Sequence, residues 1–312
     1  MKGLEIAEAY YEAYGRPMLE EQFPDIMPLI AAGLAGSGSE CFGYDDDISR
    51  DHDFEPGFCI FLPSEDIVDR RTAFLLERAY AKLPKEFMGL KRSLVNPAGG
   101  QRHGVIRTGD FFREKTGRPD ADLSIKEWLT IPEASLAEAV NGRIFYDGYG
   151  EVNRIRRYLS YYPEDIAKKK LAGSLLMAAQ AGQYNYERCL KHGETAAAQL
   201  AVYQFCENMM NVLFILNRKY RPFYKWSFRA LRSLDRLSYS AELLEYLLTS
   251  DNDENAPEKI RVIEGLCADV IDELTASGLT GAICGDLEKH AYSVNDRITD
   301  ADLRNMHILA AV

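Results

Sequence analysis

The chain has 312 residues, of which 46% are hydrophobic and 27% charged, and its formal charge is −11. This balance is typical of a soluble globular protein, and the length allows two domains of ordinary size. No apolar run reaches the roughly 20 residues needed to span a bilayer, and the acidic N-terminus does not resemble a signal peptide. We therefore expect a cytoplasmic protein with no membrane partner. The acidic excess argues against a general affinity for nucleic acid.

The six cysteines lie far apart in the sequence, without the close spacing of a zinc knuckle. In a chain of this size they are expected to be free thiols rather than disulfides or zinc ligands.

The first 150 residues mix helical periodicity with short β-prone runs. An opening helix is indicated by apolar residues spaced by three or four between Leu4 and Tyr14. An aromatic run that leads into Leu62 predicts a strand, which Pro63 ends. Residues 64–83 predict a helix with Ser64 as a candidate cap, and residues 103–108 predict a second strand.

From Pro163 onward the pattern is almost entirely helical. Pro163 followed by two acidic residues is a favourable helix start. Phe205, Met209, Val212 and Leu216 have the spacing of one buried helical face. We therefore predict an α+β protein: a small mixed-sheet domain over residues 1–150, followed by an all-α helical bundle over residues 151–312.

The segment from Gly36 to Phe61 carries the strongest functional pattern. It begins with a Gly-Ser turn, where small side chains let backbone N–H groups approach phosphate oxygens. Asp51 and Asp53 follow at the start of a predicted strand, where alternate side chains point to the same side, so the two carboxylates are expected to lie side by side. Two such carboxylates with a phosphate are a common Mg²⁺ ligand set. Taken alone, either feature is more often an ordinary turn.

The order of these features resembles the signature of the polymerase-beta-type nucleotidyltransferase superfamily, which includes the aminoglycoside nucleotidyltransferases. The longer string GSGSECFGYDDDISRDHDF, with RYRPFYKW downstream, resembles an uncharacterised bacterial nucleotidyltransferase-like family. The resemblance implies ATP or another nucleoside triphosphate as substrate, and Mg²⁺ as cofactor. It implies Asp51 and Asp53 as catalytic metal ligands. It also implies a phosphate-binding turn made by Gly36, Ser37, Gly38 and Ser39.

Two departures from the superfamily pattern stand out. His52 replaces the usual apolar residue between the aspartates, and a packed imidazole is the simpler interpretation. Many members also carry a third carboxylate on a neighbouring strand, whereas residues 104–108 contain no acid. Asp110 lies just beyond and is the candidate third acid, although a helix-capping role explains it equally well.

Within the helical half, Lys225 lies in a basic, aromatic-rich segment. The resemblance implies that a lysine in this context reaches the triphosphate, whereas a basic helix end with core aromatics is the simpler alternative. Asn208 and Asn211 could face a cleft or be buried and satisfied. For Arg154, Arg156 and Arg157, a packed connection between the domains is the preferred interpretation.

The resemblance implies a Mg²⁺-dependent transferase that moves a nucleoside monophosphate, most simply AMP from ATP, to a hydroxyl of a small-molecule or protein acceptor. The partners are thus a nucleotide and an acceptor that the sequence does not identify. The main alternative is a catalytically inactive nucleotide-binding or regulatory protein of the same fold, since the third acid is missing. A second alternative is an antitoxin-like transferase that modifies a protein partner.

Overall fold

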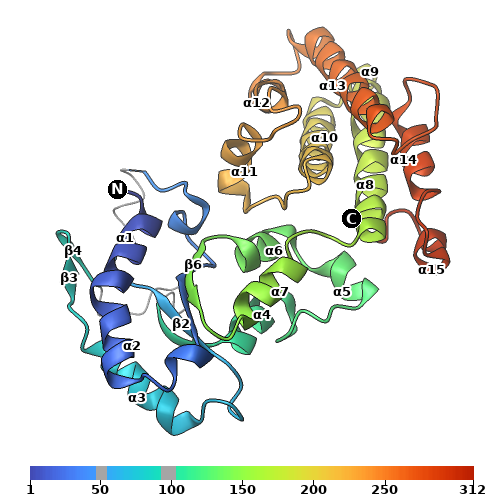
Figure 1. The fold of residues 1–312 in the computed structure, drawn as a ribbon. Helices are drawn as coiled ribbons and strands as arrows, with labels where there is room; N and C mark the ends of the chain where they lie inside the picture. Colours follow the sequence, from blue (N-terminus) through green and yellow to red (C-terminus); the bar gives the residue numbers. More distant parts are fainter. Residues whose placement is uncertain (47–54, 93–102) are drawn as a thin grey trace. The chain divides into compact units, whose positions relative to one another are not determined.

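The computed structural model describes residues 1–46, 55–92 and 103–312 (Figure 1). Two compact units are present. The N-terminal unit comprises residues 1–123 and 132–160, and the helical unit comprises residues 124–131 and 161–312. The first contains a mixed sheet with helices and the second is helical. This composition confirms the predicted α+β class.

A four-stranded sheet with the order β5-β2-β1-β6 is the centre of the N-terminal unit. Strand β2 runs antiparallel to β1 and parallel to β5, and β6 pairs antiparallel with β1. The two predicted strands are thus confirmed as β2 and β5, although Thr108 begins a helix rather than ending the second strand. The strands are β1 (Ala31–Leu34), β2 (Cys59–Leu62), β5 (Gly104–Arg107) and β6 (Arg143–Asp147), and a separate small hairpin joins β3 (Glu86–Phe87) to β4 (Leu90–Lys91).

Helices cover both faces of this sheet, which explains why β1 and β2 are buried along their whole length. Phe58 and Ile60 pack into a core with the helices at the start of the chain. Phe61, on the other face, makes an edge-to-face contact with Phe111 at a centroid distance of 5.3 Å. The helices of this unit are α1 (Gly3–Tyr10), α2 (Arg16–Gln22), α3 (Arg70–Ala81), α4 (Thr108–Thr116), α6 (Glu133–Val140) and α7 (Glu151–Tyr158), with a wide π-helical turn at Tyr11–Gly15 and 3-10 turns at Met27–Leu29 and Glu40–Phe42.

One helix boundary differs from the sequence prediction. The helix expected from residue 64 begins at Arg70, and its cap is Asp69, whose carboxylate accepts a hydrogen bond from the Thr72 amide at 2.7 Å. Ser64 instead begins a turn, in which its carbonyl accepts from the Ile67 amide. Both residues are good caps by type, and the turn decides between them.

The helical unit is built around the long helices α8 and α10. The predicted helix start at Pro163 is confirmed, and the four residues proposed as one face of α10 are all buried. The helices of this unit are α5 (Ile125–Thr130), α8 (Glu164–Ala178), α9 (Glu187–Lys191), α10 (Thr195–Leu216), α11 (Tyr224–Leu231), α12 (Ser240–Thr249), α13 (Ala256–Ala276), α14 (Leu287–Asn295) and α15 (Ala301–Asn305), with a π-helical turn at Ala179–Tyr186 that continues α8.

A fully buried lysine fixes the end of the chain to α8. The Lys169 ammonium donates to the Asn295 side chain at 2.9 Å and to the Met306 carbonyl at 2.7 Å. Both acceptors are neutral oxygens. These hydrogen bonds therefore satisfy the Lys169 ammonium without pairing it with a carboxylate.

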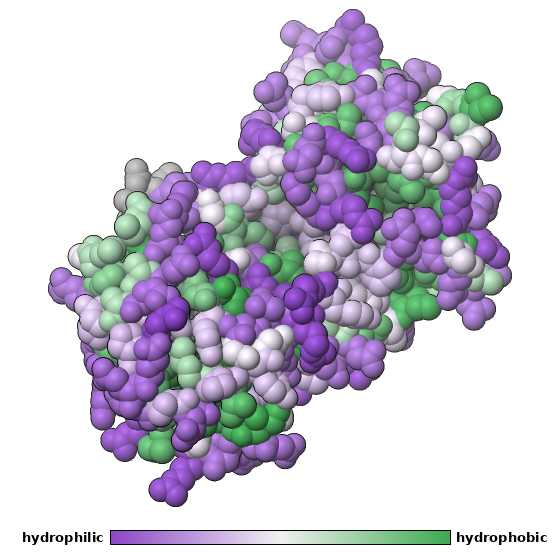
Figure 2. All heavy atoms as spheres, in the orientation of Figure 1, coloured by the Kyte–Doolittle hydropathy of each residue, from purple (hydrophilic) through white to green (hydrophobic). Residues whose placement is uncertain are grey.

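Hydrophilic residues predominate on the face drawn in Figure 2, and apolar residues lie between them in small groups. Among the described helices, none combines the length and apolar character that crossing a membrane requires. No disulfide joins the six cysteines, and four of them, Cys41, Cys59, Cys206 and Cys267, are buried.

Candidate functional site

The pairing of β1 with β2 determines where the Gly-Ser turn lies. Gly33 pairs with Cys59 and Ala31 with Phe61, so β2 begins beside the end of β1. The turn at residues 36–39 follows β1, and the chain returns to the described structure at Glu55, shortly before β2. A small cavity of about 10 Å³ is lined by both Leu34 and Glu55. The turn and the residues that lead into β2 therefore share one edge of the sheet.

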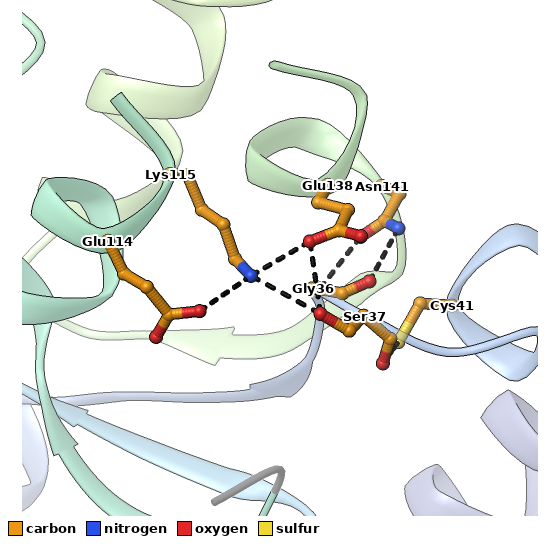
Figure 3. A network of polar contacts seen from close by, with 7 residues as sticks. All are labelled: Gly36, Ser37, Cys41, Glu114, Lys115, Glu138 and Asn141. Carbon is orange, nitrogen blue, oxygen red and sulfur yellow. Dashed lines mark hydrogen bonds and ion pairs between the residues drawn. The ribbon is translucent and has the colours of Figure 1, made fainter. Parts of the chain in front are cut away.

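Two glycines give this turn its conformation. Gly36 has φ +106° and Gly38 has φ +130°, a region that residues with a Cβ atom rarely adopt. The Asn141 side chain holds Gly36 from both sides: its Oδ1 accepts from the Gly36 amide at 2.8 Å, and its Nδ2 donates to the Gly36 carbonyl at 2.8 Å (Figure 3). The turn is thus fixed by a residue more than 100 positions further along the chain.

The amide groups of the turn that matter most belong to Gly38 and Ser39. Within the described parts of the chain, neither N–H donates to a protein acceptor. Both residues are only partly buried. Unpaired backbone N–H groups in a glycine-rich turn form a concave site that suits an anion. The phosphate-binding role of the turn stays a prediction.

A polar triangle lies against the same turn (Figure 3). The Ser37 hydroxyl donates to Oε2 of Glu138, from α6, at 3.0 Å. The ammonium of Lys115, from α4, donates to the same Oε2 at 2.8 Å and to the Ser37 hydroxyl at 3.3 Å. Glu114 makes a further ion pair with Lys115 at 2.8 Å. The network brings three segments of the chain together at the turn.

The electrostatic environment keeps Lys115 charged although only 8% of its side chain is exposed. Burial by itself lowers the pKa of this ammonium, but the hydrogen bonds that it donates to Glu114 and Glu138 outweigh burial and raise the pKa above its ordinary value. At neutral pH the turn therefore has a positive charge beside it, with two carboxylates as its partners.

A second polar contact lies where β2 and β5 begin. Nδ1 of His103 lies 3.2 Å from Oε1 of Glu55, and both side chains are mostly buried. Gly57 makes room for the imidazole, since a Cβ atom at that position would come within 2.7 Å of the ring. Glu55 and His103 also line the small cavity at this edge, together with Glu40. Two carboxyl side chains and an imidazole thus gather there.

The predicted metal ligands Asp51 and Asp53, with His52 between them, lie outside the described residues. The acidic run before them is described in part. Asp45 is buried, and its carboxylate accepts from the Gly3 amide at 3.0 Å, so this residue fixes the start of α1. Among residues 1–46, 55–92 and 103–312, no three His, Cys, Asp or Glu side chains are placed so that they could hold one metal ion, and those that line the small cavity are no exception.

The candidate third acid, Asp110, lies in the first turn of α4. Its carboxylate is 63% exposed and pairs with Arg113 at 2.5 Å. The adjacent Phe111 faces the turn, because a Cβ atom on Gly36 would meet its ring at 3.3 Å. Asp110 therefore occupies a solvent-exposed position on the helix, and its catalytic role stays a prediction. Strand β5 itself carries no carboxylate.

Of the residues singled out in the helical half, Lys225 and Asn208 belong to the helical unit, whereas Arg156 does not. Lys225 is exposed in the first turn of α11, and its ammonium lies 4.4 Å from the Trp226 ring centroid. Asn208 is buried and donates to the Gln204 carbonyl at 2.8 Å, which matches the alternative of a satisfied buried side chain. Arg156, in the N-terminal unit, donates to the Val140 and Asn141 carbonyls at 2.7 Å.

Sequence reasoning missed Lys115, Glu138 and Asn141, the residues that hold the turn. Their positions follow from the pairing of β6 with β1 and from the packing of α4 against α6, neither of which leaves a local motif. The only local signal is the Asn141-Gly142 dipeptide, a common turn sequence. That signal marks a turn but does not reveal its partner.

Comparison with known proteins gives limited similarity. Residues 128–227 match the family described as a domain of unknown function, DUF4037. No curated protein matches the chain. The solved structure of a nucleotidyltransferase-like protein from Exiguobacterium sibiricum 255-15 is similar to it with a TM-score of 0.38 and 11% identity. That similarity covers 94% of this chain and 81% of the other.

Proposed function

We propose that this protein is a Mg²⁺-dependent nucleotidyltransferase whose Gly36–Ser39 turn binds the phosphates of ATP or another nucleoside triphosphate. The observation that supports the proposal most directly is the turn itself: Gly38 and Ser39 present N–H groups with no acceptor among the described residues, at the edge where β2 begins. In such a turn the peptide dipoles favour a phosphate oxygen.

In this proposal Asp51 and Asp53, which precede in sequence the residues that lead into β2, would hold the metal. Two carboxylates with phosphate oxygens are the ligands that Mg²⁺ prefers, and the ion would neutralise charge on the phosphates. The protein's own part is to position the triphosphate on the turn.

The reaction has a simple balance. A hydroxyl oxygen of the acceptor bonds to the α-phosphorus of the nucleotide, and the bond from that phosphorus to the bridging oxygen of the β-phosphate breaks. Pyrophosphate leaves, and the hydroxyl proton passes to a base or to water. Carboxylates and histidine are the usual bases for such a proton.

A second candidate function, nucleotide binding without transfer, is favoured by one specific observation. Strand β5, which lies beside β2, consists of Gly104, Val105, Ile106 and Arg107 and offers no acid. Asp110 is exposed and paired with Arg113. In this alternative the turn binds nucleotide, and the protein reports its presence to a partner.

Calorimetric titration with ATP, with and without Mg²⁺, tests the shared part of both functions. We expect Mg²⁺-dependent binding that Asp51→Asn with Asp53→Asn abolishes. The chain offers a matched control in Asp120 and Asp122, an exposed Asp-x-Asp pair in the same unit, whose double asparagine variant should bind normally. Equal binding by both double variants would refute the proposed metal site.

Pyrophosphate release then separates the two functions. Release from ATP in the presence of small hydroxyl acceptors or cell-extract protein supports the transferase. Binding of ATP without release under any of these conditions supports the binding protein instead.

A further inference from the structure

Lys115 and Ser37 direct their donors at a single point. The Lys115 ammonium and the Ser37 hydroxyl both donate to one oxygen, Oε2 of Glu138, at 2.8 and 3.0 Å (Figure 3). The two donors also lie 3.3 Å from one another. Convergent donors around one anionic oxygen are the arrangement that a phosphate oxygen requires. A carboxylate of the protein itself fills that arrangement here.

The oxygen on which the Lys115 and Ser37 donors converge lies beside the proposed phosphate-binding turn. Ser37 immediately precedes Gly38 and Ser39, whose N–H groups have no acceptor within the described chain. Lys115 is held close to the turn by α4, since the Gly36 position also lies within 4 Å of its side chain. The Ser37 hydroxyl lies 3.3 Å from the Lys115 ammonium, so both donors stand beside the residue that precedes the two amides.

We infer that Lys115 and Ser37 form a polyphosphate subsite of this turn, and that Glu138 is an internal competitor that occupies the subsite. The inference rests on the proposed nucleotide-binding function. A phosphate oxygen takes the place of Glu138 Oε2 between the two donors, and the carboxylate turns away. Glu138 thus sets a threshold, because only a ligand with more charge than one carboxylate displaces it. A triphosphate or tripolyphosphate meets this condition better than a monoanion does.

Two roles are open to Glu138: it could compete with a phosphate ligand for Lys115, or it could only stabilise the turn. Two carboxylates face the ammonium, those of Glu114 and Glu138. The Glu114 side chain is 65% exposed, whereas that of Glu138 is 20% exposed and is the one that contacts Ser37. If the network only fixed the turn, removal of either end of the Lys115–Glu138 pair would loosen the turn. If Glu138 competes with a ligand, removal of its charge helps the ligand.

The test is calorimetric titration with tripolyphosphate in metal-free buffer at neutral pH, on the full chain. Lys115→Met should weaken binding about tenfold or more, the value expected for a lost charge-assisted hydrogen bond. Glu138→Gln, which keeps the size and removes the charge, should tighten binding about threefold or more. Glu114→Gln removes an equal charge at the exposed position and should change affinity less than about twofold.

The inference depends on affinity changes of opposite direction: Lys115→Met should weaken tripolyphosphate binding, and Glu138→Gln should tighten it. Weaker binding by both Lys115→Met and Glu138→Gln would identify a structural brace and overturn it. Lys115→Arg is the matched control, since it keeps the charge and should retain most of the affinity. The thermal unfolding midpoint of each variant shows whether it is folded.

The inference and the proposed function fail in different ways. If the wild-type chain binds ATP with Mg²⁺ and Lys115→Met binds it equally well, the subsite is wrong and the nucleotide site stands. If the wild-type chain binds neither ATP nor tripolyphosphate, both are refuted.

Discussion

Asn141 satisfies both backbone polar groups of Gly36, with two hydrogen bonds of 2.8 Å between its side-chain amide and the glycine's own N–H and carbonyl. This pairing imitates one step of a β-ladder at a place where the chain turns out of the sheet. It holds a glycine at φ +106° that has no partner strand of its own.

Asn141→Ala should therefore loosen the turn. Loss of both hydrogen bonds leaves the Gly36 groups to water and should lower the free energy of unfolding by about 1–3 kcal/mol. Urea unfolding measures this change, and ATP titration should show weaker binding. Asn153→Ala, at an exposed asparagine of α7, is the control and should be nearly neutral. Similar behaviour of the two variants would contradict the role given to Asn141.

A comparison of Gly142 with Gly43 separates the cost of backbone strain from the cost of a steric clash with a neighbouring strand. Both have positive φ, +68° and +70°, so alanine at either costs about 1–2 kcal/mol in the backbone. Gly43 has open space around it, whereas a Cβ atom on Gly142 would lie 2.0 Å from the Leu34 carbonyl oxygen of β1. We expect Gly142→Ala to be clearly more destabilising than Gly43→Ala in urea unfolding. Equal losses would show that β6 does not approach β1 as closely as described.

Tyr11 and Tyr80 form a matched pair, since both pack edge-to-face on Phe58. The Tyr80 hydroxyl donates to the Phe58 carbonyl at 2.8 Å and accepts from its amide at 3.0 Å. The buried Tyr11 hydroxyl has no hydrogen-bond partner in the described structure. Tyr80→Phe should thus cost about 1–3 kcal/mol, whereas Tyr11→Phe should be neutral or stabilising. A larger loss for Tyr11→Phe in urea unfolding would contradict this assignment.

The buried hydroxyl of Tyr11 also leads to a prediction for alkaline solution. Burial raises the pKa of Tyr11 from 10.0 to about 12, although the nearby Arg16 opposes the change. The folded protein then holds this proton more tightly than the unfolded chain does, so stability is lost as pH rises from about 10 towards 12. Tyr11→Phe should show a shallower loss over this window when unfolding midpoints are compared. An identical slope would mean that the hydroxyl is hydrated.

Lys169 should have the opposite effect on stability. Burial lowers the pKa of its ammonium below 10.5, so the unfolded chain binds the proton more tightly than the folded protein does. Stability from this group therefore rises with pH between the lowered pKa and 10.5. Lys169→Met should lack that rise, whereas Lys168→Met, at a lysine paired with Asp165, should keep it. Unfolding midpoints across this range provide the measurement, and a rise that persists in Lys169→Met would refute it.

Local patterns in the sequence were sufficient to predict strands β2 and β5 and a Gly-Ser turn, whereas β1 and β6 were not predicted. Strand β2 is apolar because both of its faces are covered, and the glycines at positions 36 and 38 are where φ is positive. What holds the turn was not predictable, because Asn141 and Glu138 are brought to it by long-range packing. A side-chain amide or carboxylate carries no mark in the sequence of the backbone group that it will meet. The predicted roles of Asp51 and Asp53 depend on residues outside the described chain and stay predictions.

The short helix α5 belongs to the helical unit although the chain on both sides of it belongs to the N-terminal unit. Trp128 and Leu129 of this helix are buried; the Trp128 ring packs against Tyr162, and the Leu129 carbonyl accepts from Lys170. The polypeptide consequently crosses between the units after residues 123, 131 and 160. Neither half is an excisable module: a polypeptide truncated after residue 160 would carry α5 without its neighbours, and a protease that severs one crossing would leave two covalent connections intact. A break after residue 160 would thus remove the buried Trp128 and Leu129 from the core of the helical unit while leaving the N-terminal unit whole.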